Sequence, residues 1–113
     1  LCTSGWNTYA AMALPGSNLY KKAIDQNHTL PNNYEGYSFH SYETQPLPTE
    51  TLKAEEILEY RDESFKKYHT YGAFLKKIEQ KFGKRAWDNI RDMAKVNLKR
   101  KILGHSLWKK LMI

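Results

Sequence analysis

Apolar and polar residues follow different patterns in successive segments of this chain. Residues 6–14 are apolar on both alternating faces apart from Asn7 and Thr8, which is typical of a strand buried on both sides of a parallel sheet. A Pro-Gly pair ends this segment. Ser17 follows as a suitable N-cap, and apolar side chains recur at helical spacing across residues 17–27. The beginning of the chain therefore predicts a strand, a turn and a helix.

From residue 53 onward the apolar positions recur every three or four residues, which is the spacing of one helix face. This pattern predicts helices over residues 53–68, 72–81 and 84–103. Gly83 and Gly104 stand at the expected ends of the last two, because glycine readily adopts the positive φ found after helices. Short connections between amphipathic helices predict a small bundle. The positions expected to be buried on the first of these helices are Ala54, Ile57, Leu58, Phe65 and Tyr68.

Residues 28–50, called the aromatic loop below, lack helical periodicity and are rich in Asn, Gly, Ser, Tyr and Pro. Their prolines exclude helix nearby. A loop this long is uncommon in a compact domain unless it is functional or disordered, and its aromatic content predicts ordered packing. Two interpretations stay open: the loop covers a neighbouring substrate cavity, or it packs structurally across the helices.

The expected fold is mainly α, with a C-terminal helical bundle over residues 51–113, preceded by a single strand-turn-helix over residues 1–27 and the aromatic loop. A chain of 113 residues forms one domain and buries roughly two thirds of its unfolded surface. No apolar run reaches the roughly 18 residues that span a bilayer, and the first residues lack the basic flank of a secretory signal. We therefore expect a cytoplasmic protein without a transmembrane segment.

Charge is distributed unevenly along the chain. Residues 1–83 carry nine basic and ten acidic side chains, whereas residues 84–113 carry nine basic and two acidic ones. Clustered cations attract nucleic acid, anionic membranes or acidic partners, although a solvated helix face has the same composition. A stand-alone basic module that binds nucleic acid or an acidic partner is therefore one functional hypothesis. Its candidate cations are Lys95, Lys99, Arg100, Lys101, Lys109 and Lys110.

Catalytic chemistry has little support in the sequence. Cys2 is the single cysteine, so the chain forms no internal disulfide and supplies no thiolate cluster. The four histidines are too scattered for a metal motif, and we predict no metal site. The weakest hypothesis is a self-contained enzyme that uses His40 with Glu43 or Asp62 as acid and base.

Six short motifs follow one another in an order that folding alone does not require: PGSNLY, LP, GYSFHSYET, PLPT, EYRD and KFG. In this order they resemble the C-terminal region of cobalamin-binding radical S-adenosylmethionine enzymes, the group that includes the anaerobic magnesium-protoporphyrin monomethyl ester cyclases. The resemblance covers residues 9–103. Lys53 stands where that pattern has a capping Ser or Thr, which leaves the start of the helix open, with Thr51 as an alternative cap.

The resemblance implies a parent enzyme that uses a 4Fe–4S cluster, S-adenosylmethionine and cobalamin. Residues 1–27 would end its partial β/α barrel, and the upstream barrel and cobalamin domains of the same chain would be the partners of this region. No catalytic residue is expected here, and cofactor-binding residues stay unassigned. The side chains expected on the substrate side are Tyr9, Met12, Tyr37, His40 and Tyr42.

Residues 6–14 would be a single strand without the neighbouring strands of the barrel. A lone buried-type strand exposes unpaired backbone groups. It should fold back onto the helices, pair with a second copy of the chain, or stay disordered.

Overall fold

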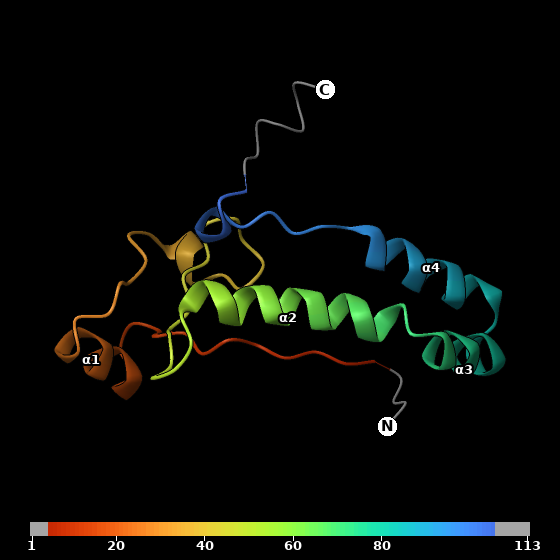
Figure 1. Ribbon diagram of the computed structural model, residues 1–113, viewed down its shortest axis with the longest axis horizontal. Helices are drawn as coiled ribbons and strands as arrows, with labels where there is room; N and C mark the ends of the chain where they lie inside the picture. The colour runs from red at the N-terminus through yellow and green to blue at the C-terminus, as the bar shows by residue number, and fades with distance from the viewer. Residues whose placement is uncertain (1–4, 106–113) are drawn as a thin grey trace, which may run out of the picture. The chain divides into compact units, whose positions relative to one another are not determined.

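The computed structural model describes residues 5–105, and within them the chain is mainly helical and has no strand (Figure 1). This confirms the mainly α prediction and is consistent with a helical bundle. No helix of the described residues combines the length and hydrophobicity that crossing a membrane requires. The elements are α1 (Asn18–Asp25), η1 (Tyr34–Tyr37), α2 (Ala54–His69), α3 (Gly72–Phe82), α4 (Lys84–Lys95) and η2 (Lys101–Leu103), the two η elements being short 3₁₀ helices.

The described residues form two compact units. The helical-hairpin unit contains residues 5–8 and Arg61–Asn97, and the loop unit contains Tyr9–Tyr60 and residues 98–105. Helix α2 begins in the loop unit and ends in the helical-hairpin unit. Each unit is described by itself below.

Helix α1 begins where the sequence predicts. The backbone of Ser17 is extended, and its hydroxyl accepts a hydrogen bond of 3.1 Å from the Tyr20 amide, which satisfies one of the free N–H groups at the helix start. Ala23 of this helix is buried with Ala13 and Leu47. The core of the loop unit therefore joins α1 to the segment before it and to the end of the aromatic loop.

Residues 6–14 do not form the predicted strand. Within the loop unit, the carbonyl of Ala11 accepts a hydrogen bond of 2.8 Å from the Leu47 amide. Within the helical-hairpin unit, Trp6 stacks on Tyr68 of α2 at 6.1 Å between ring centroids. A strand requires continuous pairing with a neighbour, and these isolated contacts do not supply it. The segment instead folds back onto the same chain, and pairing with a second copy stays a prediction.

Helix α2 agrees with its predicted bounds to within one residue. Ala54 and Leu58 of the expected stripe are buried, and its other members are half-buried. The turn before the helix is held by Thr49, whose hydroxyl accepts a hydrogen bond of 3.0 Å from the Leu52 amide. The side chain at this turn is thus Thr49, two residues before the cap proposed from the sequence.

Helices α3 and α4 pack against each other as a hairpin (Figure 1). Gly83 joins them with φ of 91°, a value that favours glycine as predicted. Phe74 and Ile78 from α3 and Ala94 from α4 are buried. Apolar contact between two helix faces therefore supplies the core of this hairpin.

Helix α4 ends at Lys95, eight residues before the predicted end at residue 103. In a continued helix the Lys101 amide would bond to the carbonyl of Asn97, four residues earlier. It donates instead to the carbonyl of Tyr42 at 2.8 Å. Tertiary pairing with the aromatic loop has replaced the helical hydrogen bond, so the prediction of a helix over residues 96–103 is wrong.

Candidate functional site

The aromatic loop is ordered by its own hydrogen bonds. The side chain of Asn33 caps η1 by accepting from the Gly36 amide at 3.2 Å. The hydroxyl of Ser41 donates to the carbonyls of Glu35 and Ser38, and the Gln45 amide donates to the Gly36 carbonyl at 2.9 Å. These polar bonds close the loop on itself.

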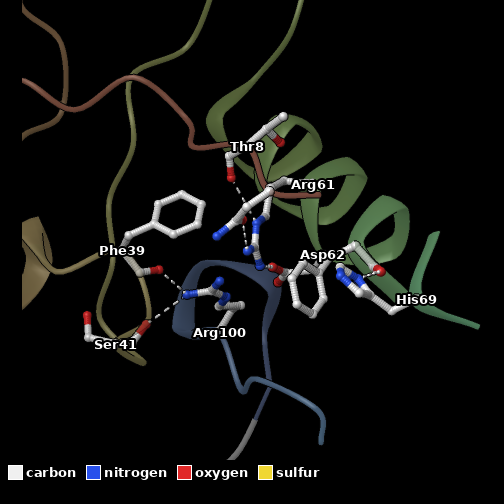
Figure 2. A network of polar contacts seen from close by, with 9 residues as sticks. Thr8, Phe39, Ser41, Arg61, Asp62, His69 and Arg100 are labelled. Atoms are coloured by element: carbon white, nitrogen blue, oxygen red, sulfur yellow. Dashed lines mark hydrogen bonds and ion pairs between the residues drawn. The ribbon is translucent and has the colours of Figure 1, made fainter. Parts of the chain in front are cut away.

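Arg100 is the most deeply buried charged residue of the loop unit, with an exposed fraction of 0%. Its Nη1 donates to the carbonyls of Phe39 at 2.6 Å and Ser41 at 3.2 Å, as Figure 2 shows. The guanidinium carbon also lies 5.7 Å from the centroid of the Phe39 ring. A buried cation is tolerated when its N–H groups are satisfied, and two carbonyl dipoles contribute to that here. Arg100 therefore holds residues 39–43, called the clamped turn below.

The clamped turn is held further by residues 98–105, called the strap below. The Lys101 amide donates to the Tyr42 carbonyl at 2.8 Å, and the Tyr42 hydroxyl donates to the His105 carbonyl at 2.5 Å. Nζ of Lys101 lies 3.8 Å from an oxygen of Glu43. All these contacts join residues about 60 positions apart in the sequence. The conformation of the clamped turn therefore depends on contacts with a distant part of the chain and not on local bonds alone.

Two of the predicted substrate-side residues meet at one ring. Tyr9 is 66% exposed, and its ring lies edge-on to Phe39 at 4.9 Å between centroids. His40 is exposed, and its ring lies edge-on to Phe39 at 5.4 Å. Arg100 holds the backbone of Phe39 in place through its carbonyl. The exposed rings of Tyr9 and His40 both contact the Phe39 ring, so their positions depend on this bond. Their contact with a substrate stays a prediction.

The other predicted substrate-side residues are less available. Tyr42 is half-buried and bonded to the strap, and Met12 and Tyr37 are also half-buried. Burial raises the pKa of the Tyr37 phenol above its ordinary value, and the neighbouring Tyr20 raises it further. The Tyr37 phenol therefore keeps its proton at neutral pH and does not act as a base there.

Arg61 is the corresponding buried cation of the helical-hairpin unit, with an exposed fraction of 5%. Nε donates to the Thr8 carbonyl at 3.1 Å and Nη2 to the Asn7 side chain at 2.6 Å, whereas Nη1 lies 3.1 Å from Asp62 (Figure 2). The guanidinium also lies over the ring of Phe65 at 4.8 Å. The arrangement attaches residues 7–8 to α2, which agrees with a structural role for the Arg61–Asp62 pair.

Replacing Arg61 by leucine is expected to release residues 5–8 from α2. The Thr8 carbonyl and the Asn7 amide oxygen lose charge-assisted hydrogen bonds, each typically worth roughly 1.5–3 kcal/mol. In protein labelled with 5-fluorotryptophan, the ¹⁹F resonance of Trp6 should shift toward that of an exposed indole, because stacking on Tyr68 is lost. Lys67→Leu, at an exposed position of the same helix, is the matched control. An unchanged Trp6 resonance in Arg61→Leu would contradict this structural role.

Only some of the basic residues predicted to bind phosphate are accessible for it in the folded chain. Arg100 is fully buried and bonded to backbone carbonyls, so phosphates do not reach it. Lys95 lies 3.8 Å from Asp92, and Lys101 the same distance from Glu43, in exposed or partly exposed ion pairs. Two further candidates, Lys109 and Lys110, lie outside the described residues.

The chain does not fit a 4Fe–4S cluster by itself. Such a cluster is held by several thiolates, whereas the chain has one cysteine, Cys2, which lies outside the described residues. Within residues 5–105, no three His, Cys, Asp or Glu side chains gather in a way that would hold a metal ion. His69 is buried, and its Nδ1 lies 2.8 Å from the Phe65 carbonyl, which indicates a structural histidine.

An open hollow of about 420 Å³ lies on the helical hairpin and is lined by Leu75, Trp87 and several polar residues. The polar side chains at its wall, Lys76, Glu79 and Gln80, are all exposed to solvent. A binding site usually places a few polar groups within an enclosed apolar pocket. The hollow lacks that construction.

The two buried arginines were not predicted as core residues. Arg61 lies three residues after Leu58 and four before Phe65, so its place on the apolar stripe of α2 was visible in the sequence. Arg100 gave no comparable signal, because the helical pattern places it among solvent-exposed cations. Its partners lie about 60 residues earlier in the chain.

Similarity to known proteins does not fix the family of this chain. No family model, no curated protein and no solved structure matches it. The ordered motifs, the exposed apolar side chains of residues 9–24 and the geometry of the clamped turn are therefore the basis for assigning a function.

Proposed function

We propose that this chain is the C-terminal region of a cobalamin-dependent radical S-adenosylmethionine enzyme, a cyclase, methyltransferase or related enzyme. In this role it closes or buttresses the barrel and does not itself carry the catalytic residues. The cluster, S-adenosylmethionine and cobalamin are held by upstream domains of the same cytoplasmic protein. The ordered motifs from PGSNLY to KFG are the sequence basis of the proposal.

The exposed apolar surface of residues 9–24 is the observation that carries the proposal. Within these 16 positions four large side chains are strongly exposed: Tyr9 at 66%, Leu14 at 52%, Leu19 at 41% and Ile24 at 49%. A contiguous apolar patch marks an interaction site, and we infer that these four side chains become part of one when neighbouring domains cover them. The same residues are assigned by the resemblance to the end of the barrel, where neighbouring strands would cover them.

The clamped turn adds a second argument. Arg100 holds the backbone on both sides of His40, through the carbonyls of Phe39 and Ser41, while the imidazole stays exposed. A side chain that must contact a bound molecule benefits from a fixed backbone. A turn of this construction suits a loop that covers the mouth of a barrel and contributes polar groups to it.

The coding sequence upstream of Leu1 provides the first test. A continuous reading frame that encodes a cobalamin-binding domain and a C-x3-C-x2-C motif is the expected result. A start codon beside Leu1, without such domains before it, would overturn the proposal.

Hydrogen exchange provides the second test, on the longer protein. Peptides from residues 9–24 should exchange more slowly there than in the 113-residue chain, because barrel strands cover them. Peptides from α4 provide a reference in the same experiment. Equal exchange of residues 9–24 in the two proteins would contradict docking of this surface.

A basic module that binds nucleic acid or an acidic partner is the alternative proposal, supported by the excess of cations in residues 84–113. Phosphate binding of this kind weakens steeply as salt rises. Affinity for single-stranded or duplex DNA that falls by orders of magnitude between about 50 and 200 mM salt would favour this alternative. An absence of binding at the lower salt concentration would exclude it.

A further inference from the structure

One hydrogen bond of the strap has a histidine ring nitrogen as its acceptor. The backbone amide of Arg100 lies 3.0 Å from Nδ1 of His105. A backbone N–H acts as donor, so Nδ1 must supply a lone pair, and the proton of the neutral ring lies on Nε2. The bond therefore exists with the neutral imidazole and not with the imidazolium.

His105 also holds the strap through its own backbone. Its amide donates to the Arg100 carbonyl at 3.1 Å, and its carbonyl accepts from the hydroxyl of Tyr42 in the clamped turn. The ring bond and the backbone bond thus close the strap around residues 100–105. Loss of the ring bond loosens the residue that anchors Tyr42.

Protonation of His105 would place a third cation among groups that are already positive. Arg100 and Lys101 are its charged neighbours in the strap, and the clamped turn contributes Tyr42 and Glu43. The carboxylate of Glu43 already contacts Lys101 and accepts a hydrogen bond of 3.0 Å from the side chain of Asn33. His105 is exposed, so Nδ1 can take up a proton from solvent once its bond to the Arg100 amide opens.

We propose that His105 is a pH-sensitive latch: the neutral ring holds the strap on the clamped turn, and protonation of the ring releases it. Because the ring bond needs the lone pair of Nδ1, the strap is closed with the neutral imidazole and open with the imidazolium. The latch controls how firmly the backbone beside His40 is held. It depends on contacts within the loop unit alone and does not rest on the proposed enzyme family.

Hydrogen exchange of two assigned amides tests the latch in the 113-residue chain. The Arg100 amide reports the ring bond, and the Lys101 amide reports the attachment of the strap to Tyr42. The protection factors of both should fall on acidification from pH 8 to 5, approaching about tenfold per unit once the ring is largely protonated. Loss of protection at Arg100 alone, with Lys101 unchanged, would overturn the proposal because the strap would then stay closed.

Two variants separate the ring proton from other effects of pH. His105→Asn keeps an acceptor oxygen in the place of Nδ1 and does not take up a proton, so both amides should stay protected at pH 5. His105→Ala removes the acceptor, so protection of Lys101 should be low at pH 8 and pH 5 alike. Acid-induced loss of protection in His105→Asn equal to that of the natural chain would contradict the latch, as would full protection in His105→Ala.

Discussion

Replacing Arg100 by methionine is expected to lower the free energy of unfolding of the loop unit by about 2–4 kcal/mol, since bonds to a charged donor contribute about 1.5–3 kcal/mol each. The variant leaves the carbonyls of Phe39 and Ser41 without the guanidinium that they share. Methionine fills a similar length of space without the charge, which limits the contribution of a cavity to the result. The loss therefore reports mainly on the buried hydrogen bonds.

Urea unfolding and hydrogen exchange of the Lys101 amide measure this effect. Lys99→Met is the matched control, because it removes a half-buried cation from the neighbouring position and should change stability by less than about 0.5 kcal/mol. Arg100→Lys keeps the charge but lacks the planar guanidinium that places Nη1 between the two carbonyls, so an intermediate loss is expected. Equal stability of Arg100→Met and the natural chain would show that the clamp does not hold the turn.

Replacing Gly36 by alanine is expected to destabilise the loop unit by about 1–3 kcal/mol, the usual range for an overpacked site. A Cβ at this position would overlap Cβ of Pro31 and lie 3.3 Å from the carbonyl oxygen of Glu43. The proline ring has little freedom to move away. The aromatic loop must therefore shift as a whole.

Gly72→Ala is the control for this change. Its added Cβ meets no atom within 4 Å, and the position lies at the start of α3, where alanine is the better helix former by up to about 1 kcal/mol. Thermal unfolding should show a lower midpoint for Gly36→Ala and an equal or higher one for Gly72→Ala. The same midpoint for both variants would mean that η1 does not pack on Pro31 as described.

Local signals in the sequence predicted several elements correctly. Ser17 caps α1, the three-and-four spacing gave α2 and α3 to within one residue, and Gly83 separates α3 from α4. Each of these features depends on residues within one or two helical turns of one another. Such interactions are present in any context that keeps the segment intact, which is why the sequence suffices for them.

The two wrong predictions have a common cause. Residues 6–14 have the composition of a buried strand, but a strand needs a neighbour that the described chain does not provide. Residues 96–103 have helical spacing, but the amides of Arg100 and Lys101 bond to His105 and Tyr42 instead of the preceding turn. In the first case no long-range pairing supported the local preference, and in the second the contact with Tyr42 outweighed it.

The candidate site was predicted in part. The sequence indicated an ordered aromatic loop and named Tyr9 and His40, which the structure brings together on Phe39. It gave no indication that Arg100 supports this ring from a segment about 60 residues away. Burial of a cation depends on acceptors that only a folded chain brings to it.

By itself, the sequence determined the helical class, the first helix cap, the bounds of the middle helices and the position of the aromatic loop. The tertiary structure alone decided that Arg100 lies in the interior of its unit, that α4 stops at Lys95, and that the strap holds the clamped turn. The physical reason is the range of the interactions. Capping and helical periodicity act between near neighbours, whereas a buried guanidinium is stable only where distant carbonyls meet it.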